Sequence, residues 1–134
     1  MPRTVAILGA SRDRMKFGNK AVRAYRQVGY RVYPIHPTET EIEGLTVYRD
    51  LRSVPGTIDR VALYVPPRIG ITLLEEIATR RPGDLYLNPG TESPELLQRA
   101  HELGLEPVQA CAIRAIGIDP GTLDDDAAEG GRRR

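Results

Sequence analysis

Short apolar runs alternate along this chain with longer amphipathic stretches, and the two patterns indicate strands and helices. Runs that are nearly all apolar are typical of strands buried on both faces of a parallel sheet. The predicted strands are residues 4–8, 31–35, 60–65 and 84–87, with weaker candidates at 45–48 and 106–109. Apolar residues at helical spacing predict helices over residues 19–28, 68–80 and 94–103. Asn19 and Ser93 are the expected N-caps of the first and third helices.

Strands that alternate with helices predict right-handed crossovers, and hence a parallel sheet that is covered on both faces. We therefore expect a single Rossmann-like α/β domain over residues 1–120, with three layers and a mainly parallel sheet. Pro34 lies inside the second strand and favours an edge position or a strand end. Residues 121–134 have almost no apolar side chains, so we expect them to form a flexible polar tail.

Composition narrows the range of functions. The chain has 134 residues, of which 40% are hydrophobic and 28% charged, as in an ordinary soluble domain. We expect this length to be too short for a two-domain dehydrogenase, kinase or ligase. A net charge of +1 gives no electrostatic reason to expect nucleic acid or a membrane as a partner. A single cysteine, Cys111, excludes an internal disulfide, and two histidines argue against a metalloenzyme. With no apolar run near ~20 residues and no signal sequence, the expected compartment is the cytoplasm.

The candidate site lies in the loops that follow the strands, because ligands of open α/β sheets bind beyond the carboxyl ends of the strands. The first loop starts with Gly9-Ala10-Ser11, and Gly18-Asn19 opens the next helix. Small residues let the backbone approach a phosphate, and the helix amides attract the anion. The loop also carries Arg12, Arg14 and Lys16, and it matches neither G-x-G-x-x-G nor the P-loop.

The residues at the end of the second predicted strand help to distinguish NAD from NADP and coenzyme A as the ligand. An NAD site places an acidic residue there to hold the ribose hydroxyls. This strand ends in His36-Pro37, and the next carboxylate is Glu39. Histidine tolerates a phosphate near the ribose, as in NADP or coenzyme A (CoA), although an exposed loop histidine is an equally good interpretation.

The remaining loops offer contacts rather than chemistry. Pro66-Pro67 forms a rigid corner without amide donors, and Asn88-Pro89-Gly90 is explained mostly as a turn. Cys111 is either a small buried residue or a thiol near the ligand. Neither a Ser-His-Asp set, nor a carboxylate pair, nor an activated cysteine can be assembled from these loops, so we expect no catalytic activity.

Five segments together resemble the small CoA-binding proteins, stand-alone Rossmann-like domains that are similar to the CoA-binding domain of the succinyl-CoA synthetase alpha subunit. The segments are residues 5–12, 29–37, 64–67, 88–90 and 109–111. The likeness runs in order from about Thr4 to Ile118. The family commonly has asparagine where this chain has His36, and the synthetase domains have a lysine where it has Glu39. An aromatic-and-glutamine pattern of the relatives is replaced by residues 87–90.

The resemblance implies CoA as the cofactor and assigns the residues that would bind it. The phosphate loop and helix start would be Gly9, Ala10, Ser11, Arg12, Lys16, Phe17, Gly18 and Asn19. The nucleotide would be bracketed by His36, Pro37, Tyr64, Val65, Pro66 and Pro67. Asn88, Pro89 and Gly90 would lie nearer the pantetheine, and Cys111 matches a cysteine of the relatives.

We therefore predict non-catalytic binding of CoA or an acyl-CoA by a carrier, a sensor or the partner subunit of an unidentified protein. Two alternatives stay open. One is an NAD(P)-binding, oxidoreductase-like domain, and the other is a domain of the same fold that has lost its ligand and binds a protein.

Overall fold

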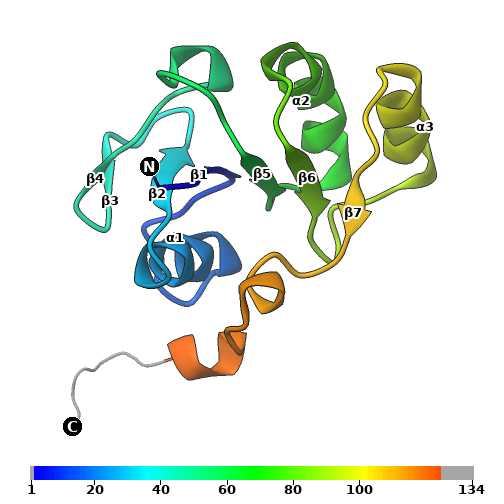
Figure 1. Cartoon of the computed structure of the whole chain (residues 1–134). Helices are drawn as coiled ribbons and strands as arrows, with labels where there is room; N and C mark the ends of the chain where they lie inside the picture. Colours follow the sequence, from blue (N-terminus) through cyan, green and yellow to red (C-terminus); the bar gives the residue numbers. More distant parts are fainter. Residues whose placement is uncertain (1, 125–134) are drawn as a thin grey trace, which may run out of the picture.

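A five-stranded parallel sheet forms the middle layer of the computed structural model, which describes residues 2–124 (Figure 1). Its strands are β1 (Thr4–Leu8), β2 (Arg31–Ile35), β5 (Arg60–Leu63), β6 (Asp84–Leu87) and β7 (Val108–Gln109). Their spatial order is β2-β1-β5-β6-β7, with every pair parallel. The predicted fold class is confirmed. β2 lies at an edge of this sheet, the position that Pro34 favours.

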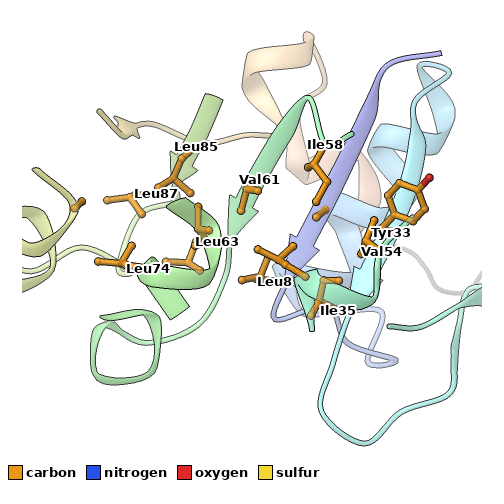
Figure 2. Packing of buried hydrophobic residues seen from close by; sticks show 14 of the residues in the cluster. Leu8, Tyr33, Ile35, Val54, Ile58, Val61, Leu63, Leu74, Leu85 and Leu87 are labelled. Atoms are coloured by element: carbon orange, nitrogen blue, oxygen red, sulfur yellow. The ribbon is translucent and has the colours of Figure 1, made fainter. Parts of the chain in front are cut away.

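Three helices cover the two faces of the sheet. α1 (Phe17–Gln27) packs on one face, and α2 (Pro67–Arg80) and α3 (Pro94–Glu102) pack on the other (Figure 1). Each face has its own apolar core. Figure 2 shows the α2 side, where Leu63, Leu74 and Leu87 meet between sheet and helix. The opposite core joins the other side of β1 to α1 through Ile7 and Tyr25.

The helix ends follow the expected signals at one helix and depart from them at another. Ser93 caps α3, since its Oγ accepts a hydrogen bond from the Leu96 amide at 3.1 Å. The prediction that Asn19 caps the first helix is wrong. α1 begins at Phe17 with Lys16 in the N-cap position, and Asn19 is fully buried inside the first turn.

A small hairpin connects the two halves of the sheet. It consists of β3 (Glu41–Ile42) and β4 (Leu45–Thr46), so the strand expected over residues 45–48 is shorter and belongs to a second sheet. Tyr48 then forms a single parallel bridge with Ile35, at the end of β2. A 3₁₀ turn, η1 (Leu51–Ser53), leads on toward β5.

The chain after β7 crosses back toward α1 in two 3₁₀ turns, η2 (Arg114–Ile116) and η3 (Pro120–Leu123). η3 packs against α1 with Leu123 buried. The Nζ atom of Lys20 in α1 forms an ion pair with Asp124. The tail expected from Gly121 therefore has an ordered start, while its residues 125–134 lie outside the described part of the chain. Across residues 2–124 no helix is long and apolar enough to cross a membrane.

Candidate functional site

The loops after β1 and β5 diverge at the point where the sheet reverses its winding direction. In an α/β sheet this switch point is the usual ligand site. Gly9 sits there with a φ of +92°, and a Cβ on it would lie 2.8 Å from the Tyr64 carbonyl oxygen. A Cβ on Gly18 would collide with the Gly9 carbonyl oxygen. Two glycines thus let the first loop, the start of α1 and the end of β5 meet closely.

A groove of about 840 Å³, here called the main groove, opens at this switch point. It is formed by the segments that follow β1, β2, β5 and β6. Its lining residues are Gly9, Ala10, Ser11, Lys16, Phe17, Gly18, Ile35, His36, Pro37, Arg49, Tyr64, Val65, Pro66, Ile69, Leu73, Pro89, Gly90 and Thr91. Most residues expected at the site are therefore brought together here. The exceptions are Arg12, Asn19, Pro67, Asn88 and Cys111.

The main groove is electropositive. Lys16 and Arg49 are the charged residues among its described lining, which includes no carboxylate. Arg49 lines the main groove, and the sequence analysis did not predict it. It follows Tyr48, whose bridge to Ile35 brings it beside the end of β2. A single bridge of this kind leaves no periodic pattern in a sequence, so no signal was available.

Arg12 and Asn19 play other parts in the structure. The Arg12 guanidinium lies 3.7 Å from a carboxylate oxygen of Glu39 and is mostly exposed. The Asn19 amide donates to the Ser11 carbonyl oxygen at 2.9 Å and to Glu43 at 3.0 Å. Its oxygen accepts from Arg23 at 2.7 Å. Asn19 therefore holds the first loop in place, and its side chain forms its hydrogen bonds with other residues of the protein.

His36 organises the turn after β2. Its Nδ1 accepts hydrogen bonds from the amides of Thr38 at 3.1 Å and Glu39 at 3.0 Å. A neutral ring that accepts at Nδ1 carries its proton on Nε2. Nδ1 lies as many bonds from the backbone as the side-chain oxygen of asparagine. His36 can thus form the same turn as an asparagine in its place.

This equivalence gives a prediction for the turn. His36→Ala is expected to lower the free energy of unfolding by about 1 kcal/mol, because two amides lose their acceptor. His36→Asn should stay within about 0.5 kcal/mol of the wild type, because the acceptor is restored. Urea denaturation of the three proteins measures both values. Equal destabilisation by the two substitutions would contradict this role of Nδ1.

A second cavity of about 400 Å³ adjoins the main groove. Its lining residues are Phe17, Lys20, Tyr64, Asn88, Pro89, Cys111, Arg114, Asp119, Pro120, Gly121 and Asp124. Phe17, Tyr64 and Pro89 line both spaces, so the two are neighbours that share these residues. Asn88 and Cys111, expected at the site, belong to this second cavity.

Asn88 joins three strand ends at the second cavity. Its amide donates to the Leu63 carbonyl oxygen at 2.9 Å, and its side-chain oxygen accepts from the Ala112 amide at 2.8 Å. The Asn88 side chain is buried, and these bonds connect the ends of β5 and β6 with the segment after β7. Asn88 therefore fixes the position of the segment after β7, which forms one wall of the second cavity.

Tyr64 carries an unusual hydroxyl group. Among the buried side-chain polar atoms of residues 2–124, it is the one that lacks a hydrogen-bond partner. Leaving such a group unpaired costs roughly 1–3 kcal/mol. Burial raises the pKa of Tyr64 far above its ordinary value, so the hydroxyl remains a protonated donor.

Together the two spaces favour a ligand with separate anionic and apolar parts. Lys16, Arg49 and the start of α1 attract negative charge, since a helix N-terminus carries a partial positive charge. Ile69 and Leu73 offer apolar contact in the same groove. Within the described residues, His, Cys, Asp and Glu side chains form no group of three or more that could hold a metal ion.

Solved structures share this architecture. A conserved hypothetical protein from Pyrococcus furiosus superposes with a TM-score of 0.74 at 32% identity, over 82% of this chain and 93% of that one. A dinucleotide-forming acetyl-coenzyme A synthetase from Candidatus Korarchaeum cryptofilum gives a TM-score of 0.69 at 26% identity. That match covers 81% of this chain but 26% of the synthetase.

Curated relatives lead in the same direction. The alpha subunit of ADP-forming acetate–CoA ligase II from Pyrococcus furiosus is 30% identical over an alignment of 115 residues, and the match covers 78% of this chain. The aligned region is 25% of that subunit, so the chain spans about a quarter of its length. Residues 3–116 match the model of the CoA binding domain. With the fold, the switch-point groove and these relatives in agreement, this chain belongs to the CoA binding domain family.

Proposed function

We propose that this chain binds CoA or an acyl-CoA in the main groove, without catalysing a reaction of its own. The observation that carries the proposal is a groove at the switch point that contains Lys16 and Arg49 and no carboxylate among its described lining. CoA brings a pyrophosphate and a ribose phosphate, and cations are the groups that recognise such anions. Its pantetheine arm requires apolar contact, which Val65, Pro66 and Ile69 provide.

The same lining argues against NAD. A carboxylate at the end of β2 is needed to hold both ribose hydroxyls of NAD. Glu39 is the first carboxylate after that strand, and it faces Arg12 rather than the main groove. His36 and Arg49 instead leave room for a phosphate near the ribose.

The role that we propose is that of a carrier, a sensor or one subunit of a larger assembly. The P. furiosus relative is named as a subunit of a ligase, which favours a protein partner for this chain as well. The site offers binding groups and holds no nucleophile paired with a base among the described residues. Chemistry on the bound thioester would then come from the partner.

Calorimetric titration with CoA, dephospho-CoA, NAD and NADP tests the proposal. We expect CoA to bind, dephospho-CoA to bind less tightly, and NAD to give no heat of binding. Binding of NAD or NADP in preference to CoA would replace the proposal with an oxidoreductase-like domain. No binding of any of the four would favour an interaction domain without a nucleotide.

The cations of the main groove should dominate the affinity for CoA. Lys16→Ala and Arg49→Ala are each expected to raise the dissociation constant of CoA about tenfold, because each removes a charge-assisted contact with a phosphate. The loss should shrink at high salt, which screens such contacts. Titrations at two salt concentrations measure both effects.

Arg31→Ala is the matched control for this experiment. It removes the same charge from an exposed residue at the first position of β2, the opposite end of the strand from the main groove. Its effect on the affinity should stay within about twofold. A loss in Arg31→Ala equal to that in Lys16→Ala would mean that only net charge matters, and would contradict specific contacts.

A further inference from the structure

The second cavity lies where the far end of a bound CoA would arrive. It borders the main groove and shares Phe17, Tyr64 and Pro89 with it. Its other walls come from the segment after β7, including Cys111, Arg114 and Pro120. In the binding mode proposed above, the nucleotide and the pantetheine occupy the main groove, which leaves the second cavity for the group attached to the thiol.

The Tyr64 hydroxyl indicates one property of that occupant. Tyr64 follows β5, and its ring packs against the core on the α1 side, where the second cavity opens. The hydroxyl is buried and finds no acceptor among the described residues. Since the raised pKa keeps the Tyr64 hydroxyl protonated, it can donate a hydrogen bond that no protein group accepts among the described residues. A ligand oxygen at this point would satisfy it.

The charges of the second cavity indicate another property. Its four charged lining residues form two pairs of opposite sign. Lys20, which is nearly buried, pairs with Asp124. Arg114 lies 3.7 Å from Asp119. The cavity is thus neutral overall, in contrast to the main groove, and a ligand group that carries its own charge would be left without a counter-ion.

We propose that the second cavity holds the acyl group of a short, uncharged acyl-CoA, with the Tyr64 hydroxyl donating a hydrogen bond to the thioester carbonyl. The inference rests on the proposed function and adds to it a preference for the thioester over free CoA. Free CoA ends in a thiol, which is a weak acceptor. It would leave the Tyr64 hydroxyl without a good hydrogen-bond acceptor and the second cavity without an acyl group.

Calorimetry with CoA, butyryl-CoA and succinyl-CoA tests this preference. We expect the wild type to bind butyryl-CoA about tenfold more tightly than CoA, the effect of one buried hydrogen bond and additional apolar contact. Succinyl-CoA, which carries a carboxylate, should bind less tightly than butyryl-CoA. In Tyr64→Phe the ratio of the two dissociation constants, CoA to butyryl-CoA, should fall about fivefold, because the hydrogen bond is lost while the apolar contact stays.

A second variant tests the charge argument by a change of selectivity. Asp124→Ala leaves the buried ammonium of Lys20 without its partner in the second cavity. The preference should then move from butyryl-CoA toward succinyl-CoA, by about tenfold in the ratio of their dissociation constants. Glu95→Ala is the matched control, because it removes an exposed carboxylate in α3 that lines neither space.

The outcomes separate the two proposals. If the wild type does not bind CoA at all, the proposed function fails and this inference fails with it. If CoA binds but butyryl-CoA binds no more tightly, only the acyl cavity is overturned. An unchanged ratio in Tyr64→Phe, or the same selectivity in Asp124→Ala as in Glu95→Ala, would also overturn it.

Discussion

Gly18→Ala is expected to lower the free energy of unfolding by about 3 kcal/mol. The added methyl group would meet backbone atoms, and no flexible side chain there can move aside to make room for it. The new methyl group would collide with the Gly9 carbonyl oxygen, and Gly9 is itself in contact with the Tyr64 backbone. The start of α1 must then move away from β1. Urea denaturation measures the loss, and titration with CoA should show weaker binding in the same protein.

Gly121→Ala is the control for this substitution. The nearest atom to its new Cβ is the Asp119 Oδ1 at 3.4 Å, and its φ lies outside the positive range. Its free energy of unfolding should stay within about 0.5 kcal/mol of the wild type. If Gly18→Ala were as stable as Gly121→Ala, the close approach of α1 and the first loop would not be needed for the fold.

The sheet could be predicted from the sequence because its signal is local. A strand such as β1, buried on both faces, requires a continuous apolar run, and Thr4–Leu8 is one. The start of α1 was misplaced because asparagine is a common N-cap. Asn19 instead satisfies Ser11 and Glu43 from inside the helix, through contacts that depend on the tertiary fold.

The same distinction applies to the candidate site. Residues that were expected directly after a strand, such as Gly9, His36 and Pro66, were predicted because parallel strands end at one edge. Arg49 was missed because one isolated bridge brings it to the main groove. The second cavity was missed because residues after Gly121 look polar, and Leu123 is the one apolar residue among positions 121–124, where it is buried.

Asn88→Ala is expected to lower the free energy of unfolding by about 3 kcal/mol, since two buried backbone groups lose their partners at once. The Leu63 carbonyl group loses its donor and the Ala112 amide loses its acceptor. Their pairing holds the segment after β7 against the ends of β5 and β6. The second cavity should therefore change shape even where the protein remains folded. Urea denaturation at neutral pH measures the loss of stability.

The pH dependence of the stability of Asn88→Asp tests the same hydrogen bonds. The new carboxylate keeps an acceptor for the Ala112 amide but faces the Leu63 carbonyl oxygen without a proton. Burial and that oxygen should raise its pKa in the folded state above its unfolded value, so the folded protein binds the extra proton. The deficit relative to the wild type should then be greatest at neutral pH and shrink as the pH falls. Gln109→Ala, which removes an exposed amide on β7, is the control and should be near neutral. A deficit in Asn88→Asp that does not vary with pH would mean that the Leu63 bond contributes little to the position of this wall.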